Sequence, residues 1–457
     1  MKSWILLACW MGGLRPSLCT LAPNRSLPRV YLLELPDELN FGLVREAFHV
    51  NFNGSVSNPV SDMKNIVEYN LGQPFPSDSP GCHFTHQFNL EMILHQRLLN
   101  SAQRVADPWD ADIIWIPYYA SFGAFFAIPV GIAEEKRARL VWQHEQRFLE
   151  WLETKAPRYH TDRSKFVMAV STVSHQFLVP PGSGWGSNLL ASPRLRGINV
   201  VSIESRPGCS KVCLGQEMSK CVDRCHGVDG RISGLATTRI IGVPYPTFYH
   251  RPPLFAESFV PWSKYGSERQ CSYLASFIGA ISHSGSFTMG IRVGLIQQCR
   301  ARPDLCLIEE ASGEPGDIQR IVSVYQSSLF CLQPPGDTAT RRGIFDSILS
   351  GCIPVVFSPD QLGGIQGYEL QYEFHLPKPY ELALLVPPNY HSSILDFLDM
   401  VSRDRERISR YQQEIRNAAG SLQYAHPKSV CMSNGCLDAL DMLLGNLVTE
   451  QLKEVGG

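Results

Sequence analysis

Two adjacent arginines and an aspartate in the stretch from Ser327 to Asp360 are the residues best suited to bind a charged ligand. Arg341 and Arg342 carry permanent positive charge and forked donors, which suit a phosphate. Asp346 follows Arg342 by four residues, one helical turn along the same face, where a carboxylate can accept from two vicinal hydroxyls, as on a ribose. The alternative is a surface ion pair between Arg342 and Asp346, which contributes only about 0.3–0.5 kcal/mol.

The sequence around these residues predicts a strand, a loop, a helix and a second strand. Ser328 to Leu332 is a short apolar run, and the PPG sequence that follows breaks the strand. Asp337 and Thr338 are good N-cap residues, so a helix is expected to begin near Thr340. Ile353 to Phe357 is a second buried strand. Together these elements form a βαβ unit whose parallel strands are covered on both faces.

The loop of this unit lies at the carboxyl end of a parallel sheet, where open α/β folds bind ligands. The start of the helix offers free amides and roughly half a positive elementary charge. Arg341 and Arg342 add their charge in the same turn. The unit is therefore expected to hold a phosphate-bearing ligand at this end of the sheet.

The run FCLQPPGDTATRRGIFDSILSGCIPVVF closely resembles the exostosin domain of glycosyltransferase family 47, and within it the plant branch that contains xyloglucan galactosyltransferases. The likeness covers roughly residues 28 to 425. Other matching stretches follow in the expected order: LLELP at 32–36, DPWDADIIWIPYYASF at 107–122, VVSIES at 200–205, GVPYPTFYH at 242–250 and SFIGA at 276–280.

This resemblance implies an α/β protein of GT-B architecture, with two facing Rossmann-like domains and a ligand cleft between them. It assigns 28–262 to an acceptor domain and 263–425 to a nucleotide-sugar domain, with a tail or helix at 426–457 that packs back onto the first domain. The implied activity is an inverting sugar transfer that uses no metal and no other cofactor, the UDP-sugar being a substrate.

The acceptor implied by the resemblance is a cell-wall or extracellular polysaccharide such as xyloglucan, and galactose is the expected sugar. Glucuronic acid, xylose and arabinose are the alternatives for the transferred sugar.

The resemblance and the predicted helix start together suggest the site residues. The general base that an inverting displacement needs is expected to be Glu204 or His86; alternatively, both bind only the acceptor sugar. His86 stands where the family commonly has Asn or another polar residue. The residues expected around the donor are Gly279, Arg292, Gln333, Gly336, Asp337, Arg341, Arg342 and Asp346.

One departure from the family affects the donor site. The family's SFAGAPR reads SFIGAIS here, so Ser282 replaces an arginine expected near the donor phosphates. His283 or Arg292 would have to compensate. The loss leaves open a second class of function, a catalytically weakened homologue that binds glycans or supports a partner enzyme. The presence of Arg341, Arg342 and Asp346 opposes that reading, since a pure scaffold would not need them.

The DAD sequence at 110–112 matches the DxD pattern of metal-using sugar transferases. It directly precedes an apolar strand, and in the family it belongs to a turn, so a structural role is expected for it. No metal ligand is assigned.

Composition sets outer limits on the function. The chain has 457 residues, of which 44% are apolar and 18% charged, so it is globular and long enough for two domains of about 200 residues. Its formal charge of −2 and the lack of a basic stripe oppose a nucleic-acid partner. A UDP-sugar needs only local positive charge.

The N-terminus predicts targeting to the secretory pathway. Lys2 is followed by the apolar run WILLACWMGGL, so residues 1–22 have the length of a signal peptide and fall short of the ~20 apolar residues of a membrane span. Family members are usually anchored in the Golgi by an uncleaved helix, so a cleaved signal and a short membrane anchor both stay open. Either places the catalytic part in the lumen, where a Golgi enzyme complex is a further expected partner. Asn24 and Asn53 begin glycosylation sequons.

Fourteen cysteines fit an oxidising compartment. Cys209, Cys213, Cys221 and Cys225 have the spacing C-x3-C-x7-C-x3-C, which could hold zinc or form two disulfides. The compartment favours disulfides. They lie in the segment 206–235, which interrupts the family pattern. A cytosolic GT-B enzyme, such as a starch synthase, is opposed by the leader and by this cysteine content.

Periodicity and turn residues place the other elements. The segment 41–80 is rich in Asn, Ser, Pro and Gly and is expected to be a loop, and GVPYPTFYHRPP at 242–253 is a proline-rich hinge between the domains. Further strands are expected at 30–35, 113–118, 166–170, 198–203, 274–279 and 305–309, and further helices at 87–99, 133–152, 289–302 and 392–422.

Overall fold

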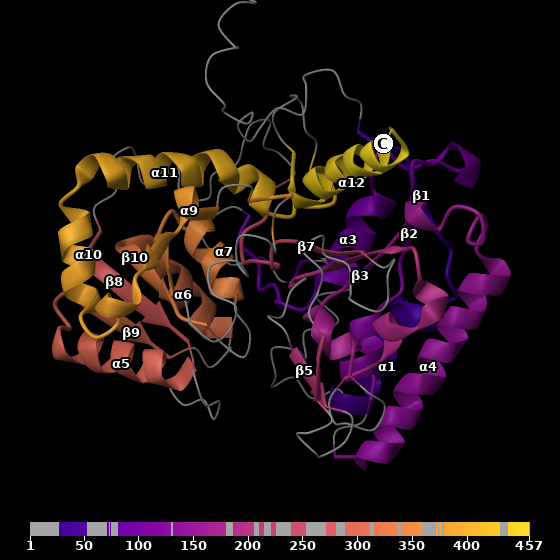
Figure 1. The fold of residues 1–457 in the computed structure, drawn as a ribbon, viewed down its shortest axis with the longest axis horizontal. Helices are drawn as coiled ribbons and strands as arrows, with labels where there is room; N and C mark the ends of the chain where they lie inside the picture. Colours follow the sequence, from indigo (N-terminus) through magenta and orange to yellow (C-terminus); the bar gives the residue numbers. More distant parts are fainter. Residues whose placement is uncertain are drawn as a thin grey trace, which may run out of the picture.

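The chain folds around two parallel sheets (Figure 1). The computed structural model describes residues 27–52, 71–72, 74, 81–128, 131–179, 186–204, 210–213, 221–224, 239–252, 271–279, 288–310, 315–335, 340–357, 372, 374–376, 379–429 and 437–456.

The first domain is built on a five-stranded sheet in the order β1-β2-β3-β4-β7, in which all neighbours are parallel. Alternation along β2 fills two cores, because Ile113 and Trp115 pack on one face of the sheet and Ile114 and Ile116 on the other. The strands are β1 (Val30–Leu32), β2 (Ile113–Ile116), β3 (Phe166–Val170), β4 (Asn199–Ser202) and β7 (Arg239–Gly242), and the main helices are α1 (Phe41–Phe52), α3 (Leu90–Leu99) and α4 (Glu134–Lys155).

The second domain repeats this plan with the strand order β12-β11-β10-β8-β9, again parallel throughout. Two Rossmann-like domains of this kind confirm the predicted fold class. The strands are β8 (Tyr273–Ile278), β9 (Cys306–Glu309), β10 (Ser328–Gln333), β11 (Ile353–Phe357) and β12 (Leu384–Val386), and the helices include α5 (Thr288–Ala301), α6 (Pro315–Ser327), α7 (Arg342–Leu349) and α9 (Pro379–Leu382).

The predicted βαβ unit is present as β10, α7 and β11. The two strands pair in parallel, with Leu332 opposite Val355. The start of the helix was predicted too early, because α7 begins at Arg342 and Arg341 has an extended backbone. The reason is tertiary: the amide and hydroxyl of Thr340 bind the Glu204 carboxylate of the first domain. That contact holds Thr340 outside the helix.

The prediction of a loop over 41–80 is wrong for its first part, which is helix α1. Leu43 and Val44 are buried against Met92 and Phe122. Asn40 directly precedes the helix, and its side-chain oxygen accepts from the Phe41 amide at 2.6 Å. Tertiary burial of one apolar face therefore outweighs the loop-like composition of the segment.

The C-terminal part crosses between the domains. The helix predicted over 392–422 is broken into α10 (Ile394–Ser402) and α11 (Arg405–Ala419), because Asp404 caps the second helix by accepting from the Arg407 amide at 3.0 Å. Helix α12 (Ala439–Gly456) follows, and α11 and α12 lie along the same side of the molecule (Figure 1). The Gln451 side chain of α12 donates to the Ser164 carbonyl at 2.8 Å, so this helix packs on the first domain.

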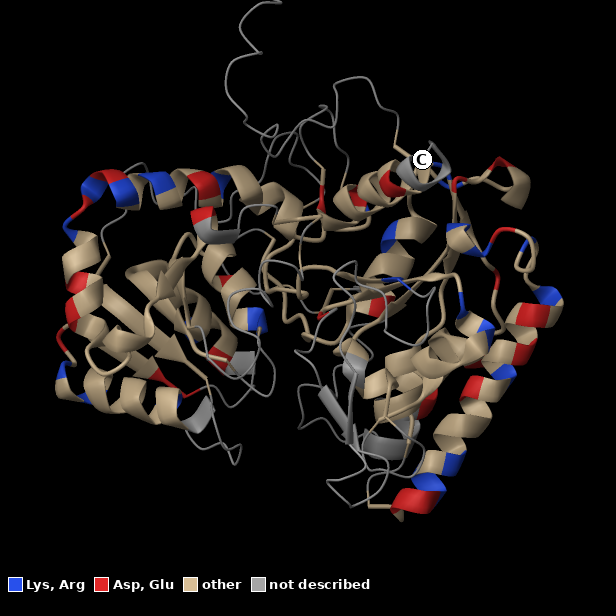
Figure 2. Ribbon diagram, viewed as in Figure 1, with Lys and Arg blue, Asp and Glu red and all other residues tan. Residues whose placement is uncertain are grey.

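Positions of both charge signs follow one another along α4 and α11 (Figure 2). In the part of the chain that the structure describes, no helix has the length and hydropathy to cross a bilayer. The predicted leader, residues 1–22, lies outside the described residues.

Among the described residues, two disulfides cross-link the second domain, Cys299–Cys306 and Cys331–Cys352. In the predicted insertion, Cys213 and Cys221 occupy opposite positions of an antiparallel pair, β5 (Ser210–Cys213) and β6 (Cys221–Arg224). Cys209 and Cys225 lie outside the described residues, so the prediction of disulfides over zinc stays a prediction.

Several buried titratable groups predict how stability depends on pH. Burial raises the pKa of Glu91 to about 8 and that of Glu145 to about 7, from 4.5, so their contribution to stability is lost as the pH rises towards those values. Burial lowers the pKa of four histidines from 6.5 to about 4, so their contribution is lost as the pH falls below 6.5. These histidines are His83, His86, His95 and His375.

Burial raises the pKa of Asp441 to about 7 in the same way. We therefore expect maximal thermal stability near pH 6.5, because the four histidines outnumber the three acids below that pH and only the acids act above it. Each group changes the free energy of unfolding by about 1.4 kcal/mol per pH unit within its window. Differential scanning calorimetry from pH 4.5 to pH 8 measures the profile. Glu91→Gln should flatten the alkaline limb and leave the acid limb in place; an unchanged alkaline limb would contradict the assignment.

Candidate functional site

Arg341 lies where the carboxyl end of β8 meets the start of α7. Its Nη2 donates to the Ile278 carbonyl at 2.7 Å, and its guanidinium lies 5.9 Å from the centre of the Phe277 ring. Gly279 makes room for it, because a Cβ there would be only 3.0 Å from Nη2. Within the described residues Arg341 has no carboxylate partner, and its buried Nη1 makes no hydrogen bond. The result is a fixed positive charge at the carboxyl end of the sheet.

Arg342 and Asp346 form the ion pair that their spacing predicts, at 2.9 Å between Nε and Oδ2. The pair is buried, so the alternative of a surface pair is wrong: the Arg342 side chain is 13% exposed and that of Asp346 is 4% exposed. Burial raises the pKa of Asp346 and lowers that of Arg342, and their mutual attraction opposes both shifts. Arg342 also donates to the Thr85 carbonyl at 2.6 Å, and the Asp346 Oδ1 accepts from the Phe248 amide at 3.2 Å.

Glu204, at the carboxyl end of β4, reaches across to the second domain. Its Oε1 accepts from the Thr340 amide at 3.2 Å, from the Thr340 hydroxyl and from the Tyr245 hydroxyl at 2.9 Å. The residue is 1% exposed. Tyr372 closes the same cluster, because its hydroxyl donates to the Ile203 carbonyl at 2.8 Å and lies 2.8 Å from the Thr340 hydroxyl. In this arrangement Glu204 positions the residue directly before Arg341.

Gln333 and Arg292 make buried hydrogen bonds near the end of β10, where the predicted donor loop begins. The Gln333 amide donates to the Ser347 hydroxyl at 2.8 Å, and its Oε1 faces Gly343, where a Cβ would lie 2.3 Å away. Arg292 donates to the Pro335 carbonyl at 3.2 Å. Both side chains are buried and fix the end of β10.

His86 is half-buried next to the contact between Arg342 and Thr85. Burial and, to a smaller extent, the Arg342 charge lower its pKa to about 4. Its Nδ1 accepts from the Phe88 amide at 3.3 Å, which leaves the proton of a neutral ring on Nε2. A neutral imidazole is consistent with either role predicted for this residue.

The structure brings most of the predicted residues together around the start of α7. Arg341 contacts Gly279, Arg342 contacts Asp346, and Glu204 contacts the residue before Arg341. Gly336, Asp337, Ser282 and His283 lie outside the described residues. The catalytic and donor-binding roles stay predictions.

Three residues that join the two domains at this point were not predicted from the sequence. Thr85, Thr340 and Phe248 all contact predicted site residues. The signal was present in GVPYPTFYH, which we interpreted as a hinge but which supplies Tyr245 and Phe248 as contacts. A run dense in aromatic residues favours a packed interface over an open linker.

Comparison with known proteins identifies the family, because the Exostosin GT47 domain matches residues 24–389, most of the chain. The chain belongs to the exostosin GT47 family. It is therefore a glycosyltransferase, as the resemblance predicted.

Several curated relatives come from Arabidopsis thaliana. "Probable xyloglucan galactosyltransferase GT17" is 27% identical over 448 residues, which cover 94% of this chain and 86% of that protein. "Xyloglucan galactosyltransferase MUR3" is 27% identical, covering 88% of this chain and 59% of that protein. "Xyloglucan-specific galacturonosyltransferase 1" is also 27% identical, and the chain spans only 46% of its length.

Similarity to solved structures is low. The Arabidopsis thaliana UGT89C1 structure, complexed with quercetin, aligns over 93% of this chain and 100% of its own with a TM-score of 0.34 and 10% identity. Sucrose-phosphate synthase from Thermosynechococcus elongatus aligns over 80% of this chain and 79% of its own with a TM-score of 0.33 and 12% identity.

The DAD sequence at 110–112 has a structural partner, because the Asp112 carboxylate accepts from the Arg29 amide at 2.9 Å and pairs with the Arg29 guanidinium. It precedes β2, at the opposite end of the strand from the carboxyl edge. Among the described residues, no group of three or more His, Cys, Asp and Glu side chains could hold a metal ion. Metal independence stays a prediction.

Proposed function

We propose that this GT47 enzyme transfers galactose from UDP-galactose to a cell-wall or extracellular polysaccharide such as xyloglucan, with inversion and without a metal. Support for the acceptor comes from the names of the relatives, which include xyloglucan galactosyltransferases at 27% identity. UDP-galacturonic acid is the second donor to consider, because a galacturonosyltransferase is equally similar.

The observation that carries the proposal is the fixed charge of Arg341. A guanidinium held at the carboxyl end of β8 without a carboxylate partner among the described residues is suited to a diphosphate. Its neighbour Gly279 lets a ligand approach the backbone at the same point. Preorganised charge of this kind stabilises a departing UDP without a metal ion.

In the proposed reaction an acceptor hydroxyl oxygen attacks the anomeric carbon as its bond to the diphosphate breaks. UDP leaves with the bonding electrons, and the hydroxyl proton passes to a general base. Glu204 and His86 remain the candidates for that base. The bonds from Thr340 and Tyr245 to the Glu204 carboxylate also favour a positioning role for Glu204.

A donor screen tests the proposal. Purified protein is incubated with xyloglucan and one of UDP-galactose, UDP-galacturonic acid, UDP-glucuronic acid, UDP-xylose or UDP-arabinose, and released UDP is measured with and without EDTA. We expect acceptor-dependent release from UDP-galactose, unchanged by EDTA, and a β-linked product by NMR. A product with α-linkage would contradict inversion, and loss of activity with EDTA would contradict metal independence.

The alternative is a weakened homologue that binds glycans without transferring sugar, which the missing arginine at Ser282 would explain. It predicts binding of xyloglucan with no release of UDP from any of the five donors. Binding and release measured on the same preparation separate the two functions.

We also propose that the enzyme works in the lumen of the Golgi apparatus. The two disulfides of the second domain support this location, because disulfides persist in oxidising compartments. Protease protection of the protein in intact microsomes tests it; digestion without detergent would oppose lumenal placement.

A further inference from the structure

The buried ion pair on helix α7 contacts two separate segments of the first domain. Arg342 donates to the Thr85 carbonyl at 2.6 Å, and its guanidinium lies 3.5 Å from the centre of the Phe248 ring. Asp346 accepts from the Phe248 amide at 3.2 Å while it pairs with Arg342. Two charged residues on consecutive turns thus each contact first-domain backbone.

The two segments that α7 contacts are also bonded to each other. Cys82 and Tyr249 form an antiparallel bridge, and the His83 amide donates to the Phe248 carbonyl at 2.8 Å. The Thr85 hydroxyl lies 2.7 Å from the His250 Nε2. A single layer made of 82–85 and 248–250 therefore rests on α7.

His86 follows this layer directly and is one of the two predicted bases. The carbonyl that Arg342 binds belongs to Thr85, the residue before it, so the backbone leading to His86 is fixed by a bond from the donor-side helix. The Arg342 charge also acts on the imidazole, because it lowers the pKa of His86 after the larger effect of burial.

We propose that Arg342 and Asp346 act as a positioning pair that fixes the His86 segment on helix α7, and that the diphosphate is bound by Arg341 instead of Arg342. This inference rests on the proposed function, because it assigns roles within the same site. Its physical basis is that both side chains contact first-domain backbone and pair with each other, whereas Arg341 has no carboxylate partner among the described residues. Within that part of the chain, one nitrogen of each guanidinium, Nη1 of Arg341 and Nη2 of Arg342, is buried without a hydrogen bond.

Other titratable groups share the layer and belong in any interpretation of pH dependence. Asp346 lies on α7 beside Arg342, His83 lies in the same segment as His86, and His250 lies in the opposite segment. His83 and His250 have lowered pKa values because they are buried. Both are therefore neutral at pH 7, and Arg342 and Asp346 are the charges that face the layer from α7.

The test compares substitutions at two adjacent arginines. Arg342→Lys keeps the charge but loses the fork that spans Asp346 and Thr85. We expect UDP affinity, measured by calorimetry, to stay within about twofold of wild type. The kcat/KM for the acceptor should fall about 10²-fold, because a displaced segment misplaces the acceptor. Arg341→Lys is the matched control, and it should weaken UDP binding.

A second measurement does not depend on turnover. In protein labelled at histidine, the NMR titration of His86, assigned with His86→Asn, should move to a higher pKa in Arg342→Met and stay close to wild type in Arg341→Lys. If Arg342→Met does not fold, the double variant Arg342→Met, Asp346→Leu removes both charges together and keeps the test available.

The outcomes are distinct. Loss of UDP affinity of about tenfold or more in Arg342→Lys, with an unchanged acceptor KM, would make Arg342 a phosphate ligand and overturn the inference. An unchanged pKa of His86 in Arg342→Met, or in the double variant with Asp346→Leu, would also overturn the inference. Failure of the wild-type enzyme to release UDP from any donor would count against the proposed function alone, because UDP binding and the His86 titration can still be measured.

Discussion

Replacement of Arg341 by alanine is expected to lower kcat for UDP release by about 10²- to 10³-fold, the usual cost of removing one preorganised donor to developing charge. The guanidinium is held by the Ile278 carbonyl and fitted against Gly279, so its position is fixed before substrate binds. Steady-state release of UDP in the presence of acceptor measures the effect. UDP affinity should fall in parallel, because the product carries the same diphosphate.

The variant is expected to fold, since it loses one hydrogen bond to a carbonyl, worth about 1 kcal/mol. Arg320→Ala is a matched control in the same domain, because that half-exposed arginine pairs with Asp317 and Glu309 at the surface. It should leave kcat unchanged. If Arg341→Ala retained wild-type kcat and UDP affinity, the proposed diphosphate site would have to lie elsewhere.

Sequence patterns predicted the elements whose periodicity is local. The apolar runs of β3 and β11 were predicted with the boundaries that the structure shows, Phe166–Val170 and Ile353–Phe357. Each is buried on both faces, so the whole run is apolar and its ends are marked by polar or turn-forming residues. The βαβ unit around α7 was predicted for the same reason.

The details of the site could not be predicted, because they depend on contacts between residues distant in sequence. Arg342 and Thr85 are 257 residues apart, and Asp346 and Phe248 are 98 apart. A helical spacing of four residues predicts the ion pair between Arg342 and Asp346, but it contains no information on which distant residues bury that pair. The same limit explains why the start of α7 was predicted too early. It depends on the contact between Thr340 and Glu204, which are 136 residues apart in the sequence.

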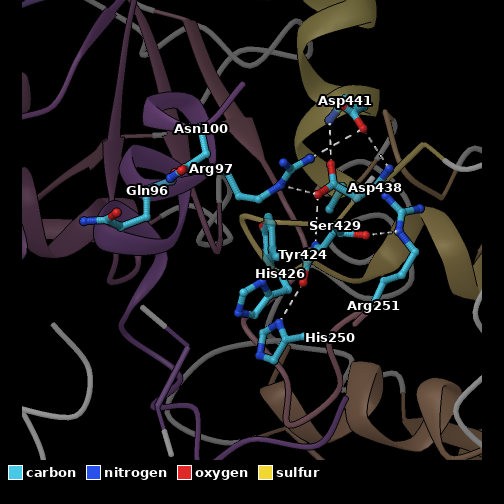
Figure 3. A network of polar contacts seen from close by, with 12 residues as sticks. Gln96, Arg97, Asn100, His250, Arg251, Tyr424, His426, Ser429, Asp438 and Asp441 are labelled. Atoms are coloured by element: carbon cyan, nitrogen blue, oxygen red, sulfur yellow. Dashed lines mark hydrogen bonds and ion pairs between the residues drawn. The ribbon is translucent and has the colours of Figure 1, made fainter. Parts of the chain in front are cut away.

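The C-terminal segment shows this limit most clearly. The sequence predicted a tail or helix after residue 426 that packs back onto the first domain, but not the contacts that hold it. Asp438 and Asp441 form reciprocal caps at the start of α12, with amide contacts of 3.0 and 3.2 Å. Asp438 also accepts from Arg97 of α3 at 2.8 Å and from the Ala425 amide at 2.9 Å (Figure 3). Arg251 lies in the same network and binds Ser429 (Figure 3). The first domain is thereby tied to the segment that returns from the second.

Asp438→Ala should lower the free energy of unfolding by about 3–5 kcal/mol, because it leaves Arg97 buried without its main partner. The Asp438 side chain is fully buried, and its loss also removes the cap of α12. Urea denaturation followed by far-UV circular dichroism and by tryptophan fluorescence measures the change. Because the network joins the two domains, the two signals should separate into distinct transitions in the variant.

Two further variants isolate the cause. Asp438→Asn keeps the shape and one acceptor oxygen, so it should lose about 1.5–3 kcal/mol, the value of a hydrogen bond to a charged group. Asp399→Ala removes an exposed aspartate paired with Arg403, and should change stability by less than about 0.5 kcal/mol. A loss in Asp438→Ala no larger than that of Asp399→Ala would mean that the buried network does not hold the domains together. The domain arrangement would then depend on the contacts around α7, among them those of Glu204, Arg342 and Asp346.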